Sequence, residues 1–262
     1  MSDREIIADR RTSLAGNDGW TRLKSHTTAR IALGRAGASL PTSEVLNFGL
    51  AHAQAKDAVH LAFKADAIAE AVQPMGFETL LVESAAPSRE SYLRRPDLGR
   101  RLSDDSRVKL QVHGSQGADI GIVIGDGLSA TAIHRNIEPL LRALIPVLRA
   151  KHLSVAPVAI ARNARVALAD EVGVALGVRA VLMLIGERPG LSSPDSIGAY
   201  LTFDPRVGKN DADRNCVSNI RPGGLSFGEG AHKLAWLIEE SFRLSGTGVQ
   251  LKDNSPTFML LE

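Results

Sequence analysis

The sequence has little of several features that define common protein classes. It holds one cysteine, Cys216, in 262 residues, so no disulfide can form within the chain, which is typical of a reducing compartment. Aromatic residues make up only 4%, which argues against a protein that reads single-stranded nucleic acid by stacking. The longest apolar run, 180–185, is far too short to span a bilayer, and the first residues carry charges where a signal peptide is apolar. We expect a soluble, cytoplasmic protein that binds neither membrane nor nucleic acid.

Positive and negative charges nearly balance in the sequence. The formal net charge is +2, which is too small to indicate a polyanionic partner. Basic residues are nevertheless concentrated in two stretches, 4–35 and 89–107. Without a recognisable nucleic-acid-reading element, such clusters are usually solvated surface or a docking surface for an acidic protein.

The N-terminal part reads as an extension. Residues 1–25 are polar and weakly patterned, which predicts an arm. An alanine-rich helical pattern follows over 42–72, as one long helix or two, with only a weak apolar stripe. A helix of this kind packs on its own domain or on a partner. We therefore divide the chain into an N-terminal arm and helical extension, 1–75, and a second domain, 76–262.

Beyond residue 76 the pattern alternates between strands and helices. Short apolar runs predict strands at 78–83, 108–112, 119–124, 154–160, 179–185 and 199–203. Between them, 133–148 has a helical face interrupted by Pro139 and Pro146, which predicts two pieces or a kink. A capping box of Ser226 and Glu229 starts a last helix, which Gly246 ends. This alternation predicts an α/β fold with a doubly wound, mostly parallel sheet.

One segment, Gly125–Ala130, has the spacing of a dinucleotide-binding fingerprint after a predicted strand. Asp126 would put a carboxylate where a pyrophosphate must sit, and the strand ending at Arg162 lacks the acid that binds a ribose. We favour a tight strand-to-helix turn. A free-standing NADP-binding oxidoreductase, with Arg162 near the extra phosphate, stays the alternative.

Metal chemistry has little support in the sequence. His52 and His60 are spaced too far apart on the predicted helix to share one ion, and no HExxH or CxxC motif occurs. We predict no metal site. Cys216 would need a histidine base to act as a nucleophile, so we expect a contact residue rather than a catalytic one.

Three loops remain as a candidate ligand surface. In an open α/β sheet, ligands lie across the carboxyl ends of the strands. Val166, Glu187 and Cys216 each follow a predicted strand, so we expect them at one sheet edge. Glu187 can accept hydrogen bonds from amides, and the Pro189–Gly190 turn can offer backbone amides in return. That surface suits a broad ligand fringed with amides better than a compact phosphate.

Several longer segments are together specific to one family. They include Ala29–Gly37, Leu50–His60, Tyr92–Leu102, Gly186–Leu191 and Asp213–Ile220, in order over nearly the whole chain. With these the sequence resembles the small (light) subunit of ethanolamine ammonia-lyase, an adenosylcobalamin-dependent enzyme.

The resemblance implies a Rossmann-like domain whose N-terminal extension docks on a large subunit, a TIM barrel that carries most catalytic groups. It implies a hetero-dodecamer of six large and six small subunits that converts ethanolamine to acetaldehyde and ammonia by radical chemistry. The cofactor, adenosylcobalamin, would lie between the chains, base-on, with its lower face against Val166, Glu187 and Cys216. No catalytic residue is assigned to this chain, and 94–101 and 42–72 are the expected subunit contacts.

Two questions stay open at this point. A non-enzymatic cobalamin carrier would show the same surface without the enzyme's activity. The sequence also leaves open whether residues 1–20 address the protein to a bacterial microcompartment or are a loose end.

Overall fold

The computed structural model describes residues 19–27, 29–114 and 117–258. Most of the predicted arm, 1–25, lies outside the described residues. Backbone contacts divide the chain into two units, one of residues 1–57 with 190–192 and one of 58–189 with 193–262. No described helix is both long enough and apolar enough to cross a membrane.

The first unit carries most of the N-terminal helical pattern. It contains the 3-10 helix η1 (Gly19–His26) and most of α2 (Thr42–His60). Only Ala58 of α2 is buried. Its large apolar side chains are exposed; they are Val45, Leu46, Phe48 and Leu50. The predicted helical segment 42–72 is two helices, since α3 (Ala65–Val72) starts anew after Lys64 and packs into the core of the second unit.

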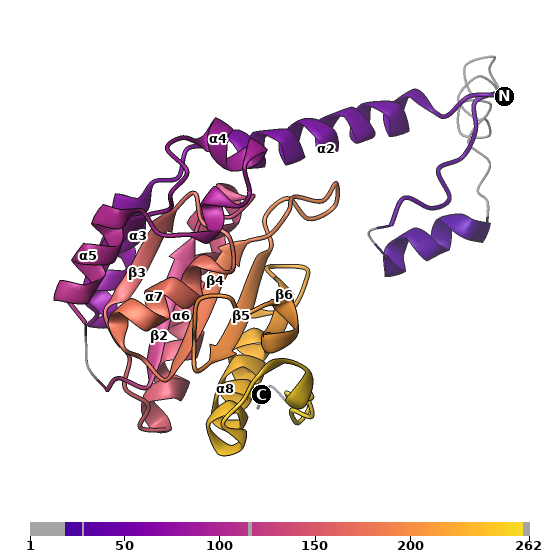
Figure 1. Cartoon of the computed structure of the whole chain (residues 1–262). Coiled ribbons are helices and arrows are strands. Elements are labelled where there is room, and N and C mark those ends of the chain that lie inside the picture. The colour runs from indigo at the N-terminus through magenta and orange to yellow at the C-terminus, as the bar shows by residue number, and fades with distance from the viewer. Residues whose placement is uncertain (1–18, 28, 115–116, 259–262) are drawn as a thin grey trace, which may run out of the picture. The chain divides into compact units, whose positions relative to one another are not determined.

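A six-stranded sheet forms the centre of the second unit (Figure 1). Its strands are β1 (Thr79–Glu83), β2 (Ile120–Gly125), β3 (Val158–Arg162), β4 (Ala180–Gly186), β5 (Ile197–Phe203) and β6 (Asn215–Ile220). They lie in the order β1-β3-β2-β4-β5-β6. The first four of that order pair in parallel, whereas β5 and β6 are antiparallel to their neighbours.

The α/β class is therefore confirmed, but a doubly wound, mostly parallel sheet is not, because the sheet is mixed. The reason lies in the connection 187–196, which contains no helix. A parallel pair needs a long crossover, usually helical, so the chain after β4 can only turn back on itself.

Helices cover the two faces of the sheet differently. On β2, Ile122 and Ile124 belong to one core cluster and Val123 to the other, as strand alternation requires. The first cluster packs under α3, α6 (Ala130–Ala150) and α8 (Phe227–Leu244). The second packs under α5 (Asp104–Val112) and α7 (Leu168–Leu176) (Figure 1). The remaining short helices are η2 (Gln73–Met75), α4 (Arg89–Arg94), η3 (Leu98–Arg100), η4 (Asp211–Asp213) and η5 (Gly248–Gln250).

One strand prediction was wrong, and one of two forms predicted for a helix is ruled out. Residues 108–112 were expected as a strand but lie in α5, which Ser103 caps by accepting a hydrogen bond from Ser106 N. For 133–148, predicted as two pieces or a kinked helix, the structure has a single helix that contains Pro139 and Pro146, so two pieces are ruled out. Its long buried apolar stripe outweighs the backbone hydrogen bonds that the prolines remove. The capping box of Ser226 and Glu229 at the start of α8 is confirmed.

Candidate functional site

The faces of β5 and β6 on the α7 side form an accessible polar surface. Val217 and Ile220 point to the opposite face and are buried in the core under α8. On the α7 side, Tyr200 is half-buried and Cys216 is exposed. We call this surface the β5–β6 face and define it by Glu187, Gly198, Tyr200 and Cys216.

Glu187 reaches over this face from the end of β4. Its Oε2 accepts a hydrogen bond from the backbone N of Asn219 at 3.2 Å. A Cβ placed on Gly198 would lie 3.0 Å from Oε1 of Glu187 and 3.1 Å from the ring of Tyr200. The glycine therefore leaves the space that the Glu187 carboxylate occupies beside Tyr200.

Tyr200 connects Glu187 with Cys216. Tyr200 lies opposite Cys216 in the β5–β6 register, so the two side chains are neighbours on this face. Burial raises the pKa of Tyr200 well above its usual value, and the nearby Cys216 and Glu187 raise it further. Burial also raises the pKa of the Cys216 thiol; the neighbouring Tyr200 hydroxyl opposes this shift, and the Glu187 charge adds to it. The thiol is thus kept protonated at neutral pH.

Cys216 was expected in a loop at the carboxyl edge of the sheet, and this was wrong. It lies within the strand β6. The polar sequence of β6 does not show the alternation typical of a strand, because a register shift between β5 and β6 interrupts that alternation. Asn219 takes a left-handed φ of 59° there. Because β5 runs antiparallel to β4, the segment after Phe203 leaves the sheet at the edge opposite Glu187. Only the return of the chain in β6 brings Cys216 toward Tyr200.

Val166 lies on the same side of the sheet, in the turn between β3 and α7. It packs, half-buried, against the same core cluster as Tyr200. The preceding turn is held by buried Asp126, which accepts hydrogen bonds from the backbone N of Asn163 at 3.1 Å and of Ala164 at 2.9 Å. Asp126 also pairs with Arg89 at 3.0 Å.

That network explains the Gly125–Ala130 turn without a dinucleotide. The carboxylate of Asp126 points into the protein, where it fastens the β3–α7 turn. A Cβ on Gly127 would lie 2.1 Å from the carbonyl oxygen of Gly186, so this glycine allows the turn to pack on β4. The turn is closed by Leu128 N donating to that same oxygen at 3.0 Å. These contacts argue against the NADP alternative.

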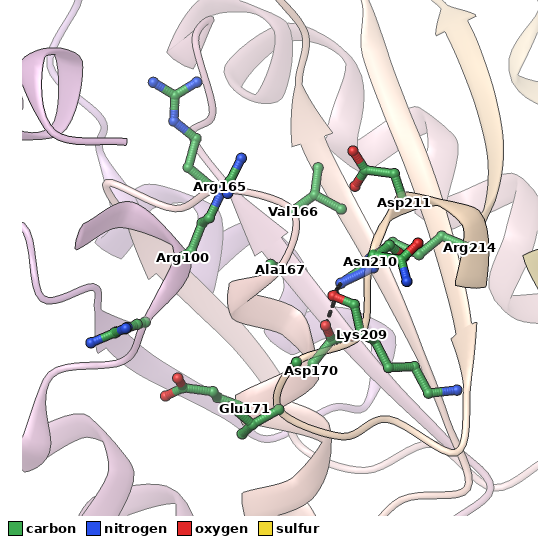
Figure 2. Close-up of a pocket in the computed structure, with 13 residues that line it drawn as sticks. Arg100, Arg165, Val166, Ala167, Asp170, Glu171, Lys209, Asn210, Asp211 and Arg214 are labelled. Atoms are coloured by element: carbon green, nitrogen blue, oxygen red, sulfur yellow. Dashed lines mark hydrogen bonds and ion pairs between the residues drawn. The ribbon is translucent and has the colours of Figure 1, made fainter. Parts of the chain in front are cut away.

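A cavity of about 480 Å³ lies beside α7 and shares Val166 as a wall (Figure 2). Its other labelled walls come from the segment after α4, from the β3–α7 turn, from α7 and from the β5–β6 connection; they include Arg100, Arg165, Asp170, Lys209, Asp211 and Arg214. Asp170 and Arg214 form a fully buried ion pair there. Burial raises the pKa of Asp170 to about 6, and the charge of Arg214 opposes that shift.

Among the described residues, no group of three or more histidine, cysteine, aspartate or glutamate side chains is placed to hold a metal ion. The candidate surface therefore offers hydrogen bonds and apolar contact.

Comparison with known proteins decides the family. A family model described as the ethanolamine ammonia-lyase light chain matches residues 17–252. The chain belongs to this family. It is thereby placed among ammonia-lyase subunits, as the resemblance of the sequence predicted.

Relatives agree with this placement of the ammonia-lyase light chain. The ethanolamine ammonia-lyase small subunit of Xanthomonas campestris is 54% identical over 242 residues, covering 91% of this chain and 89% of its own. That of Azotobacter vinelandii is 51% identical, covering 97% and 93% of the two chains. That of Pseudomonas putida is 51% identical, covering 96% and 93%.

Sequence reasoning predicted Val166, Glu187 and Cys216 of the light chain as contact residues but missed Tyr200, which lies between Glu187 and Cys216. Tyr200 was read only as part of an apolar strand, and the strand β6 was missed. The available signal was Gly198 two residues before Tyr200, since a glycine inside a strand often marks a close approach by another group.

Proposed function

We propose that this light chain is the small subunit of an adenosylcobalamin-dependent ethanolamine ammonia-lyase, which with a large subunit converts ethanolamine to acetaldehyde and ammonia. Membership of the family supports the reaction and the partner. The observation that carries the role of this chain is the meeting of Glu187 and Cys216 at Tyr200 on an accessible face.

The residues of that face fit a corrinoid. A corrin ring is broad, with an apolar body and amide side chains at its rim. Glu187 offers carboxylate oxygens to amide N–H groups, while Tyr200 and Cys216 offer a flat contact with few charges. Val166 would add an apolar contact from the β3–α7 turn.

When bound, adenosylcobalamin supplies an organic radical through homolysis of its cobalt–carbon bond. This chain's residues would hold the lower face of the corrin, and catalytic groups would come from the large subunit. The sequence has no Asp-x-His-x-x-Gly loop, since Gln111 and Val112 precede His113, so no histidine ligand to cobalt is proposed and the cofactor would stay base-on. The contribution of this chain would then be to hold the cofactor in position, because small errors in that position lower the rate of the reaction.

We further propose that residues 1–75 form the extension that docks on the large subunit, and that 76–262 form the Rossmann-like cofactor domain. The exposed apolar side chains of α2 support docking. The basic stretch 94–101 is a weaker candidate, because Arg94 pairs with Glu90 and Arg95 with Asp97. The same proposal includes a hetero-dodecamer of six large and six small subunits and a location of this complex in a bacterial microcompartment.

The test is cofactor binding by the reconstituted pair of subunits. In Glu187→Ala, we expect the dissociation constant for adenosylcobalamin, from a spectrophotometric titration, to rise about tenfold through loss of a charge-assisted hydrogen bond. Glu239→Ala, on the exposed side of α8, is the matched control. Unchanged binding in Glu187→Ala would remove the β5–β6 face from the proposal. A pair that binds the cofactor but releases no acetaldehyde from ethanolamine would favour the cobalamin carrier.

A further inference from the structure

Arg89, the first residue of α4, joins two segments that are far apart in the sequence. Its Nε and Nη2 donate to the carbonyl oxygen of Val59 at 3.0 and 2.8 Å. Its Nη1 donates to Oδ2 of Asp126 at 3.0 Å and to the carbonyl oxygen of Gly127 at 2.8 Å. All three nitrogens of one half-buried guanidinium are therefore engaged, by the end of α2 and by the β2–α6 turn.

The first of these segments is the end of α2. Val59 lies in the last turn of that helix, where carbonyl oxygens have no partner within the helix and a positive charge is stabilising. Just beyond, Lys64 N donates to Nε2 of His134 at 3.0 Å, and the ring of Phe63 stacks on His134 with the ring centres 5.7 Å apart. The chain that leaves α2 is thus held at two points, so a shift at the end of α2 reaches Arg89 instead of being absorbed by a loose linker.

The second segment leads to the β3–α7 turn. Asp126 is buried and accepts hydrogen bonds from Asn163 N at 3.1 Å and from Ala164 N at 2.9 Å. The hydroxyl of Tyr92 donates to the carbonyl oxygen of Ala164 at 3.0 Å. Ala164 is thus held at both of its backbone groups, two residues before Val166, which is the apolar contact proposed for the corrin.

The geometry of the guanidinium links these two ends. The guanidinium carbon of Arg89 lies 4.8 Å from the ring centre of Tyr92, which is fully buried. Because a guanidinium is a planar fork, its two bonds to Val59 set the direction in which Nη1 points. If Val59 moved, Nη1 would turn away from Asp126, and a buried carboxylate would lose its cation at a high cost in free energy. The end of α2 and the turn that Asp126 holds therefore do not rearrange independently.

We propose that Arg89 is a positioning residue that couples the docking of α2 on the large subunit to the binding of cobalamin at the β3–α7 turn. The inference rests on the proposed function, which gives these two roles to α2 and to Val166. A large subunit that holds α2 stabilises the arrangement in which Arg89 makes all four hydrogen bonds, and that arrangement places Val166. Because coupling between two binding sites is reciprocal, cobalamin in turn strengthens the docking of α2.

The experiment is a thermodynamic cycle with the full chain and the large subunit. Biolayer interferometry measures the dissociation constant of the two subunits without and with saturating aquacobalamin, and the ratio of the two constants reports the coupling. In Arg89→Lys, which keeps a positive charge for Asp126 but loses the planar fork, we expect this ratio to fall about fivefold or more. Direct contact of cobalamin with both subunits contributes to the ratio in every variant, so only the fall is assigned to Arg89.

A second variant and a control sharpen the test. Tyr92→Phe keeps the ring and the buried ion pair but loses the hydroxyl that holds Ala164. We expect it to dock normally without aquacobalamin and to show a lower ratio, because the turn no longer follows Arg89. Arg142→Met, at an exposed ion pair on α6, should keep the wild-type ratio.

The outcomes separate this inference from the proposed function. A role of Arg89 in stability alone would weaken docking equally with and without aquacobalamin and leave the ratio at its wild-type value. That result in Arg89→Lys, or a wild-type ratio in Tyr92→Phe, overturns the coupling and leaves the proposed function intact. A wild-type chain whose assembly does not respond to aquacobalamin overturns the proposed function, and the coupling with it.

Discussion

Cys216 shows how neighbours set the chemistry of a single side chain. It is exposed on β6, yet its sulfur contacts Tyr200 and senses the charge of Glu187. Partial burial and that negative charge raise the pKa of the thiol. Because only the thiolate reacts rapidly with electrophiles, Cys216 should be slow to alkylate at neutral pH.

This leads to a pH-dependent prediction. The rate of alkylation by iodoacetamide should rise as the pH increases through the raised pKa of Cys216. Glu187→Gln removes a negative charge that disfavours the thiolate, so its pKa should fall and the profile should move to lower pH. We expect a few-fold higher rate for this variant at pH 8, measured by mass spectrometry. A profile identical to that of the control Glu239→Gln would show that Glu187 does not act on Cys216.

Asp126 illustrates the opposite case, in which a residue in a familiar motif has a purely structural role. Its carboxylate joins the β2–α6 turn to the β3–α7 turn through Asn163 and Ala164. Arg89 joins both to the end of α2 by donating to the carbonyl oxygen of Val59 at 2.8 Å. The position of Val166 therefore depends on a buried ion pair at some distance along the chain.

At the scale of the elements, the stability of α6 depends on the hydrogen bonds of the residue that caps its first turn, Ser129. Ser129 is fully buried, accepts a hydrogen bond from Ala132 N at 3.2 Å and donates one to the carbonyl oxygen of Pro194 at 2.7 Å. The same hydroxyl thus starts the helix and fixes the connection between β4 and β5. Loss of that hydroxyl would leave the carbonyl oxygen of Pro194 without its donor, and Ala132 N would keep only its bond to the backbone carbonyl of Ser129 at 3.2 Å.

We predict that Ser129→Ala lowers the free energy of unfolding by about 2 kcal/mol, the sum of a lost side-chain cap and an unpaired, partly buried carbonyl. Chemical denaturation followed by circular dichroism measures it. Ser192→Ala, at an exposed serine, is the control and should lie within about 0.5 kcal/mol of the wild type. A loss for Ser129→Ala no larger than that of the control would contradict the role given to the cap.

At the scale of the whole molecule, the exposed apolar side chains of α2 are the feature that the packing of the single chain does not explain. It exposes Val45, Leu46, Phe48 and Leu50, with exposed fractions between 48% and 68%. An apolar group of this kind is typical of an interface. Among the described residues of its unit, Arg30 contacts this group, since its guanidinium carbon lies 4.9 Å from the ring centre of Phe48.

We predict that Leu46→Glu combined with Leu50→Glu abolishes co-purification with the large subunit. Their side chains are exposed, so the melting temperature of the isolated chain should change little. Val249→Glu, on η5 and 68% exposed, introduces one such charge at an exposed apolar side chain outside α2 and serves as the control. Normal assembly of the double variant would assign the docking surface to another element.

The sequence by itself determined much of the light chain's fold and its family. Apolar runs located β1, β2, β4 and β5, and the capping box located the start of α8, because local periodicity and capping depend only on near neighbours in the chain. The specific segments in their order were enough to identify the family. Val166 and Glu187 followed from the rule that ligands lie at strand ends.

Tertiary structure alone decided how those residues are arranged. β6 and the antiparallel return of β5 depend on pairing between distant segments, which the polar sequence 215–220 does not reveal. The same holds for Glu187 lying over Gly198, and for five basic side chains and three unpaired polar atoms meeting in one cavity. These features are set by which elements pack together, and the free energy of that packing is not encoded in any local pattern.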